Sequence, residues 1–274
     1  MTNYQTFINN SLVEASNIAT AHFGQVSSTV KADDPNQVLT EADLKIGKFL
    51  VDQVKQRYPS FNVIDEEAGV IDKNSNFTWV IDPIDGTSNF AQGLPHYGVM
   101  IGLLDQGEPI AGGVALPAFS EIYVAEKGQG VWLNGNQITL VYDKKLADSL
   151  ISYGIDGHPN QRDKTHQEMR LLEGLVLSTR NIRSSNSAYD FMMVVAGKYG
   201  AYLNKSSKIW DNVAPQVMIE EMGGKYTDFS GERLSYDQPL TRVDENFEYC
   251  AAISEQVHQE IMKICQQEEK SYDE

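Results

Sequence analysis

Residues 79–90 read WVIDPIDGTSNF, and in this stretch an apolar strand runs into two carboxylates, a proline, a glycine and two hydroxyls. Because proline cannot donate to a sheet ladder, Pro83 is expected to end the strand. The Asp-Gly pair that follows is typical of a turn, which would bring the carboxylates of Asp82 and Asp85 towards one site. If residues 86–88 then open a short helix, their backbone N–H groups offer a place for an anion. The stretch therefore predicts a loop of converging acids beside an anion site.

Carboxylates beside an anion site require a cation between them, and magnesium suits that position. Mg²⁺ takes oxygen ligands, keeps some of its waters and commonly bridges one or two carboxylates to a substrate phosphate. Paired metal ions roughly 3.5–4 Å apart can activate the attacking water and neutralise the leaving oxygen in phosphoryl transfer. The pattern thus favours hydrolysis of a phosphate ester, although Asp-Pro-x-Asp-Gly on its own can also be a simple turn.

Two further acidic points follow predicted elements elsewhere in the chain. Glu66-Glu67 comes soon after the strand expected at residues 62–64, and Asp211 stands at the start of an apolar helical run. Taken alone, the two glutamates can form a solvated turn and Asp211 can cap a helix. Together with the two aspartates of the quoted stretch, they supply acids at the ends of separate elements, as a site for two metal ions requires.

Apolar periodicity outside this stretch predicts sheets covered by helix layers. Connections at residues 105–108 and 127–130 are too short for crossover helices, so many neighbouring strands should pair antiparallel. Thr40 and Asp43 have the spacing of a helix entrance, and Asp43 can be explained by that role alone. Helices are expected around residues 8–19, 46–54, 163–174, 187–196 and 212–222 and after residue 254, and strands at residues 62–64, 78–81, 99–104, 110–115, 122–125 and 131–133 and near residue 151.

The composition suits one large globular unit or two intimately packed halves. With 274 residues, 41% of them hydrophobic, the chain can bury a sizeable core. The best candidate for a boundary between two halves lies around residues 142–149. We therefore expect residues 1–145 to form an α+β half with a mostly antiparallel sheet and the metal loop. Residues 146–274 should form an α/β half that completes the active site of one compact catalytic unit.

Charge and cysteine usage narrow the expected partners and compartment. The net charge of −16 repels nucleic acid and anionic membranes on average, so neither is an expected partner. Residues 1–25 show neither a basic leader nor an unbroken apolar span, which indicates a cytoplasmic protein. Cys250 and Cys265 form no CxxC pair and are expected to be reduced packing residues.

Three motifs together closely resemble those of the inositol monophosphatase family. They are DEE at 65–67, WVIDPIDGTSNF at 79–90 and IWDNVAPQVMIEEMGGKYTDFSG at 209–231. VLTEAD at 38–43 and RSSNSA at 183–188 fall in the order expected for the family, so the resemblance covers nearly the whole chain. It implies an α+β fold layered as an αβαβα five-layer sandwich of the sugar-phosphatase type. It also implies a magnesium-dependent phosphoric monoester hydrolase that is a lithium-sensitive homodimer.

The resemblance further implies a role for each acidic point. Thr87, with Asp43 behind it, would orient and help deprotonate a metal-activated water, and Glu67 would lie close by among the catalytic residues. The backbone amides of Gly86 and Thr87 would hold the phosphate. The ligands of two or three Mg²⁺ ions per active site would be Glu66, Asp82, the Ile84 carbonyl, Asp85 and Asp211. The substrate contacts would be Asp85, Asn186, Ser187, Ala188, Asn204 and Lys205.

Several positions depart from the family pattern, and they concern the substrate. Asn204 stands seven residues before Asp211, where inositol-specific members carry a glutamate that contacts ring hydroxyls. Asn186 replaces a common glycine, and Lys205 and Lys208 add positive charge near the expected pocket. The expected substrate is a small phosphate monoester that resembles inositol 1-phosphate. Fructose 1,6-bisphosphate, histidinol phosphate and a nucleotide 3′-phosphate are alternatives, and a non-catalytic regulatory binding protein on this fold is the alternative of another class.

Overall fold

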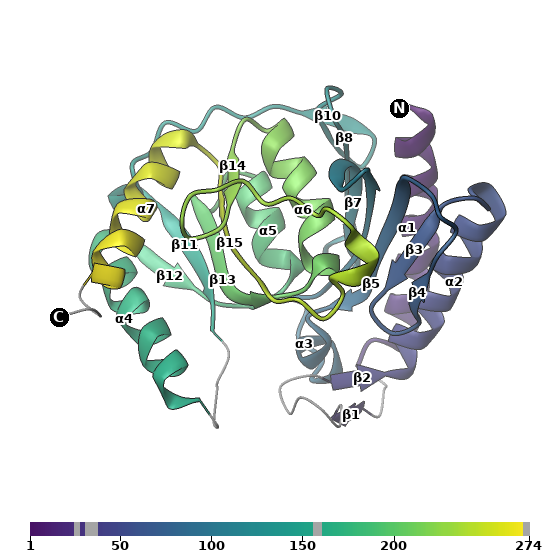
Figure 1. The fold of residues 1–274 in the computed structure, drawn as a ribbon, viewed down its shortest axis with the longest axis horizontal. Helices are drawn as coiled ribbons and strands as arrows, with labels where there is room; N and C mark the ends of the chain where they lie inside the picture. Colours follow the sequence, from purple (N-terminus) through teal and green to yellow (C-terminus); the bar gives the residue numbers. More distant parts are fainter. Residues whose placement is uncertain (25–27, 31–37, 156–160, 271–274) are drawn as a thin grey trace.

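A computed structural model of the chain describes residues 1–24, 28–30, 38–155 and 161–270 (Figure 1). The α-helices are α1 (Asn3–His22), α2 (Glu41–Arg57), α3 (Thr87–Ala91), α4 (Arg162–Ser178), α5 (Ala188–Val195), α6 (Ile209–Glu221) and α7 (Glu255–Lys270). The strands are β1 (Ser28–Val30), β2 (Val38–Thr40), β3 (Asn62–Asp65), β4 (Gly69–Ile71), β5 (Phe77–Asp85), β6 (Gly98–Asp105), β7 (Glu108–Leu116), β8 (Glu121–Glu126), β9 (Val131–Leu133), β10 (Asn136–Ile138), β11 (Leu150–Gly154), β12 (Asn181–Arg183), β13 (Ala201–Ser207), β14 (Lys225–Thr227) and β15 (Phe247–Ala252). Three short 3₁₀ helices, η1 (Pro117–Phe119), η2 (Leu146–Asp148) and η3 (Pro239–Thr241), complete the described elements.

These elements stack in five layers (Figure 1). Helices α1 and α2 cover the outer face of an eight-stranded sheet, and α5 and α6 lie between this sheet and a second sheet of five strands. Helices α4 and α7 cover the far face of the second sheet. Each sheet therefore has both faces covered, and the predicted αβαβα sandwich is confirmed.

The two sheets differ in strand direction. The large sheet has the order β10-β9-β8-β7-β6-β5-β3-β4, and its neighbours pair antiparallel except β3 and β5, which run parallel. The small sheet has the order β12-β11-β13-β15-β14, in which β11 runs parallel to both of its neighbours. The short connections from β6 to β7 and from β8 to β9 join antiparallel strands, which confirms the prediction made from their length.

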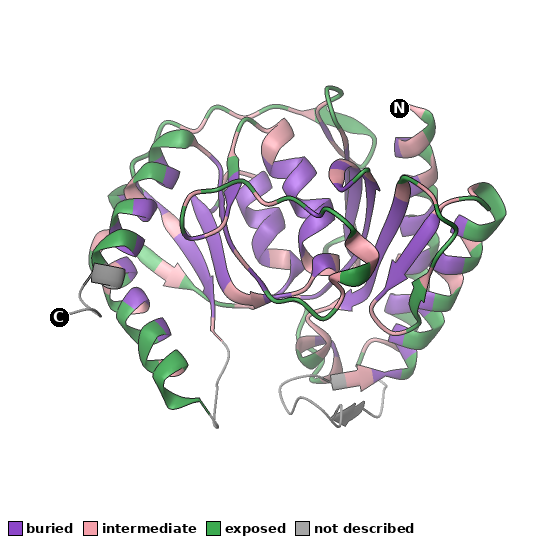
Figure 2. Ribbon diagram, in the orientation of Figure 1, coloured by how far each residue is buried: buried purple, intermediate pink, exposed green. Residues whose placement is uncertain are grey.

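Burial follows the layers (Figure 2). In α5 every residue except Tyr189 is buried, because sheets cover this helix on both sides. Helices α1 and α2 each bury one stripe and expose the opposite face. Cys250 and Cys265 are both buried, and no disulfide joins them, as predicted. No helix in the described part of the chain combines the length and apolar character that crossing a membrane requires.

One expectation from the sequence is wrong, because Pro83 does not end its strand. β5 continues to Asp85, and its pairing with β6 shifts from Asp82 opposite Met100 to Asp85 opposite Gly98. Three steps along β5 thus face two steps along β6, which is a β-bulge that tolerates the missing N–H of proline. Residues three apart on a regular strand point to opposite faces. The bulge instead lets Asp82 and Asp85 project to the same side.

Candidate active site

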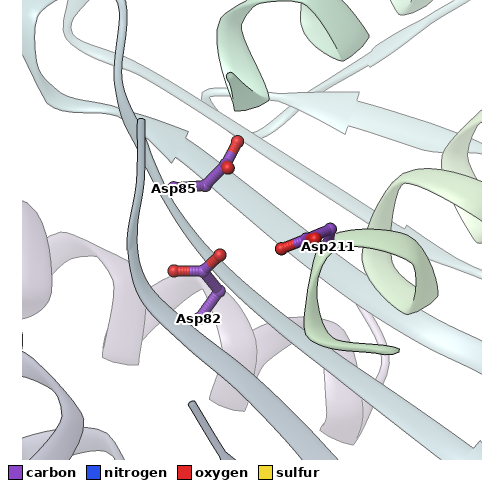
Figure 3. Close-up of side chains that lie close together, drawn as sticks. All are labelled: Asp82, Asp85 and Asp211. Carbon is purple, nitrogen blue, oxygen red and sulfur yellow. The ribbon is translucent and has the colours of Figure 1, made fainter. Parts of the chain in front are cut away.

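An acidic centre lies where the bulge of β5 meets the start of α6 (Figure 3). The carboxylates of Asp82, Asp85 and Asp211 converge, and one oxygen of each lies within 4.8 Å of the others. The bulge supplies the first two, and the first turn of α6 supplies the third. The backbone N–H of Lys208 donates to Asp211 Oδ2 at 2.6 Å. One side chain thus combines the helix-capping interaction with a place in the acidic centre.

This centre is unfavourable for carboxylates without a counter-ion. Asp82 is only 2% exposed, and its Oδ1 has no hydrogen-bond partner among the described residues. Burial first, and then neighbouring carboxylates led by Glu66, raise the pKa of Asp82 well above its usual value. Burial and then Asp211 likewise raise the pKa of Asp85, although the Ala188 N–H opposes the shift. Two unit charges about 4–5 Å apart repel by about 3–4 kcal/mol at an effective dielectric constant of about 20. Oxygen-only donors with an unsatisfied buried oxygen therefore fit a divalent ion such as Mg²⁺.

A hydroxyl and a second carboxylate stand beside the centre. Thr87 Oγ1 lies 3.3 Å from Asp43 Oδ1 and 2.8 Å from the Ile84 carbonyl oxygen. Asp43 is in the first turn of α2, where its Oδ2 accepts hydrogen bonds from the N–H and the hydroxyl of Thr40, as the capping pattern predicts. Burial raises the pKa of Asp43 to about 6, and the charge of Glu67 adds to the shift. A hydroxyl linked to such a carboxylate can hold and pass on a proton.

The turn after β5 requires glycine. Gly86 has a φ of 86°, and a Cβ there would lie 2.7 Å from the Ser187 Cβ and 2.9 Å from the His96 carbonyl oxygen. Gly86 is also the N-cap of α3, so the short helix expected at this point forms. The first N–H groups of a helix have no acceptor within it. Those of Gly86 and Thr87 can therefore bind a phosphate oxygen beside the acidic centre.

Glu66 and Glu67 lie in the tight turn between β3 and β4, and both side chains are partly exposed. The charge of Glu66 raises the pKa of Asp82 and Asp85, whereas the charge of Glu67 raises the pKa of Asp43. The two neighbouring glutamates therefore lie near different parts of the site. The structure thus brings together acids from four places: the β3–β4 turn, β5, α2 and α6.

Ser187 and Ala188 lie at the start of α5, against the acidic centre. The Ala188 N–H donates to Asp85 and helps to fix that carboxylate. Asp190 is fully buried, and its Oδ2 accepts the N–H groups of Ser185 at 3.1 Å and Ser187 at 3.4 Å. This supporting carboxylate was not predicted from the sequence. The Ser-x-x-Asp spacing of a capping box was the signal that could have found it.

Asn186 and Asn204 bind each other. The Nδ2 of Asn204 donates to Asn186 Oδ1 at 2.8 Å, and the Tyr202 hydroxyl donates to the same oxygen at 3.3 Å. The Oδ1 of Asn204 accepts the Ser206 N–H at 2.6 Å. A Cβ on Gly154 would lie 2.3 Å from Asn186 Oδ1, so the pair fills the space above that glycine. At this departure from the family pattern, the chain therefore has an amide that is engaged within the protein.

The ammonium groups of Lys205 and Lys208 contact other parts of the chain. Lys205 Nζ lies 5.1 Å from the centre of the Phe229 ring, which belongs to the buried cluster beneath α4 and α7. Asn204 instead binds Asn186 just before α5, so the side chains of Asn204 and Lys205 lie on opposite sides of the small sheet. Lys208 Nζ donates to the Asp244 carbonyl oxygen at 2.7 Å.

The sequence matches a known protein family along nearly its whole length. The sequence model of the inositol monophosphatase family matches residues 2–269. The chain is 34% identical over 193 residues to the Nus factor SuhB of Xylella fastidiosa, covering 70% of this chain and 69% of that protein. It is 30% identical over 244 residues to the fructose-1,6-bisphosphatase/inositol-1-monophosphatase of Thermotoga maritima, covering 89% of this chain and 88% of that protein.

Solved structures show the same architecture. An IMPase of Thermotoga maritima matches with a TM-score of 0.82 at 26% identity, covering 98% of this chain and 99% of that one. The extragenic suppressor protein suhB of Bartonella henselae has the same fold, with a TM-score of 0.85 at 23% identity over 96% of this chain and 98% of that one. The family expected from the sequence motifs is thereby confirmed. The chain belongs to the inositol monophosphatase family of phosphoric monoester hydrolases.

Proposed function

We propose that the chain hydrolyses a small-molecule phosphate monoester with two or three Mg²⁺ ions per active site. The observation that carries this proposal is the buried Asp82 Oδ1, which lacks a partner in the described ranges and belongs to three carboxylates whose oxygens lie within 4.8 Å. Membership of a phosphomonoester hydrolase family supports it. The proposed ligands are Glu66, Asp82, the Ile84 carbonyl, Asp85 and Asp211.

The chemistry divides between the ions and the chain. Bound Mg²⁺ would neutralise charge on the phosphate and lower the pKa of the attacking water. Thr87 Oγ1 can accept a proton from that water while it passes its own proton to Asp43 Oδ1, 3.3 Å away. The amides of Gly86 and Thr87 donate to the phosphate oxygens and hold the phosphorus for in-line attack. The ester P–O bond breaks on the opposite side, and the leaving alkoxide takes up a proton from solvent to depart as the alcohol.

The proposed substrate is a small monoester such as inositol 1-phosphate. The name of the Thermotoga maritima relative supports testing fructose 1,6-bisphosphate beside it, together with histidinol phosphate and adenosine 3′,5′-bisphosphate. Lithium inhibition and a homodimer also belong to the proposal, and the family resemblance supports both. A cytoplasmic location is supported by the two buried cysteines, which form no disulfide with each other. Assays with lithium chloride, light scattering and cell fractionation test these three parts.

Phosphate release by the purified protein tests the activity directly. Release should require Mg²⁺, and Asp211→Asn should lower kcat/KM on the order of 10²-fold or more, because it removes a charge that faces the reacting group. Asp163→Asn is a matched control, since Asp163 is an exposed aspartate in the first turn of α4. Activity without added metal in a chelator, or an unaffected Asp211→Asn variant, would reject the proposal.

A second candidate is a regulatory binding role, which the Nus factor relative favours. The net charge of −16 disfavours direct contact with RNA, so a protein partner is the better expectation. Capture of a stoichiometric partner, combined with no turnover of any ester in the panel, would favour this candidate over the enzyme.

A further inference from the structure

We propose that Asp65 is a positioning residue for the metal site, which holds Glu66 and Glu67 in place through the backbone of their turn. The inference rests on the proposed function, since it concerns how the proposed ligand Glu66 is held. Asp65 ends β3 and is only 1% exposed. Its carboxylate is thus buried directly beside two partly exposed ones, and burial of a charge requires specific hydrogen bonds.

One oxygen of Asp65 closes the turn. Asp65 Oδ1 accepts the backbone N–H of Glu67 at 3.1 Å and the backbone N–H of Ala68 at 2.6 Å. These bonds form an Asx turn, in which an aspartate side chain accepts the N–H two residues further on. Asp65 pairs with Gly69 across the β3–β4 hairpin, so only three residues make the loop. Two of the three loop N–H groups are therefore fixed by a single carboxylate oxygen.

The other oxygen of Asp65 lies against Gly47 of α2, which also closely approaches the bulge of β5. A Cβ on Gly47 would lie 2.9 Å from Asp65 Oδ2 and 3.1 Å from the Pro83 Cγ. Gly47 follows Asp43 by one turn of α2, and Pro83 lies in the bulge of β5. The absence of a side chain at Gly47 thus makes room for the carboxylate and lets α2 approach both the turn and the β5 bulge closely.

The same turn is bonded to β5 on its other side. The Glu66 N–H donates to the Ile81 carbonyl oxygen at 3.2 Å. The N–H of Glu66 is thus held by β5, and the next two N–H groups along the chain are held by Asp65. Mg²⁺ demands near-ideal octahedral geometry, so a ligand held in advance binds it better than a mobile one. Residues that support metal ligands typically change metal affinity about 10- to 100-fold when they are substituted.

Calorimetric titration of the metal-free protein with Mg²⁺ tests this role. Asp65→Ala should weaken Mg²⁺ binding about tenfold or more, because it frees both N–H groups. Asp65→Asn keeps an oxygen acceptor for them and should stay within about threefold of the wild type. Gly47→Ala, whose Cβ displaces the same carboxylate, should weaken binding in the direction of Asp65→Ala. At saturating Mg²⁺, kcat should change less than the affinity, because Asp65 contacts neither substrate nor reacting atoms.

The chain offers a matched control in Asp72, whose Oδ1 accepts the Asn74 N–H at 2.7 Å in an exposed Asx turn after β4. Asp72→Ala should leave Mg²⁺ binding unchanged. Wild-type affinity in a folded Asp65→Ala protein would overturn the proposal. If Asp65→Ala does not fold, wild-type affinity in Gly47→Ala would overturn it instead. A wild-type protein that neither binds Mg²⁺ nor releases phosphate would reject the proposed function. If the wild type does both and Asp65→Ala binds Mg²⁺ equally well, only the role of Asp65 is rejected.

Discussion

Thr87 offers a single hydroxyl proton to two acceptors, the Asp43 carboxylate and the Ile84 carbonyl. Because the Ile84 carbonyl is also a proposed metal ligand, a bound cation would compete for that oxygen and favour donation to Asp43. The raised pKa of Asp43 then makes this carboxylate a better proton acceptor than an exposed aspartate. At the scale of single residues, the hydroxyl and the carboxylate therefore act as a pair.

This pairing predicts different outcomes for two substitutions of Thr87. Thr87→Ala should lower kcat on the order of 10²-fold, because it removes the hydroxyl that donates to Asp43 Oδ1. Thr87→Ser keeps the hydroxyl and should retain most of the rate. Phosphate release at saturating Mg²⁺ measures both, with Thr20→Ala as a control for loss of an exposed helical threonine. Equal rates in Thr87→Ala and the wild type would contradict the proton path.

The turn between β5 and α3 is the element whose geometry the site tolerates least. Gly86→Ala combines an unfavourable positive φ with a contact of 2.7 Å to the Ser187 Cβ, so α3 or the start of α5 must move. We expect a loss of about 1–3 kcal/mol of unfolding free energy and on the order of 10²-fold in kcat/KM.

Gly93→Ala separates these two effects. Gly93 follows the same short helix at a φ of 73°, but a Cβ there meets nothing within 4 Å. This variant should lose about 1 kcal/mol of stability and keep nearly full activity. Thermal unfolding and phosphate release compare the two variants. Similar activity losses in both would show that backbone strain, rather than the contact with Ser187, is responsible.

The acidic centre was predictable because its signals are local. Asp82 and Asp85 are close in sequence, and Asp211 marks the start of an apolar helix. The bulge at Pro83 was not predictable, since it depends on the register of β6 and not on the proline itself. Similarly, the buried role of Asp65 depends on a glycine in a helix that is distant in sequence.

The direction of Lys205 was not predictable from the sequence, for a related reason. It lies on β13, a central strand of the small sheet that ends in the polar run Asn-Lys-Ser-Ser, and such a run carries no period-two apolar signal. Only the neighbouring strands define this segment as a strand and thereby separate Lys205 from Asn204. A charged residue that is close to site residues in the sequence therefore need not point into the site.

For the whole molecule, the acidic centre makes stability depend on pH. In the metal-free protein the pKa of Asp43 is about 6, and those of Asp82 and Asp85 are also raised, whereas aspartates of an unfolded chain titrate near about 3.9. Between about pH 4 and 6 the folded state therefore binds more protons than the unfolded state, so the unfolding free energy falls as pH rises. The titration of Asp43 alone lowers the unfolding free energy by about 3 kcal/mol over this pH range.

Scanning calorimetry checks this linkage. Without Mg²⁺, Tm should be higher at pH 5 than at pH 8, and saturating Mg²⁺ should raise Tm more at pH 8. We propose that residues 1–145 and 146–274 unfold as one unit, because α5 and α6 pack between the two sheets, so one transition is expected. Asp82→Asn removes one titrating carboxylate and should show a weaker pH dependence. A metal-free Tm that rises from pH 5 to pH 8 would contradict the argument.

The order of the site residues along the chain has a consequence for synthesis of the protein. Asp82 and Asp85 leave the ribosome long before Asp211, and β15, which pairs with both β13 and β14, follows later still. A nascent polypeptide thus cannot assemble the acidic centre until most of its codons have been read. We expect interrupted translation products to be inert towards phosphate esters, so that the cell is not exposed to a partly made hydrolase.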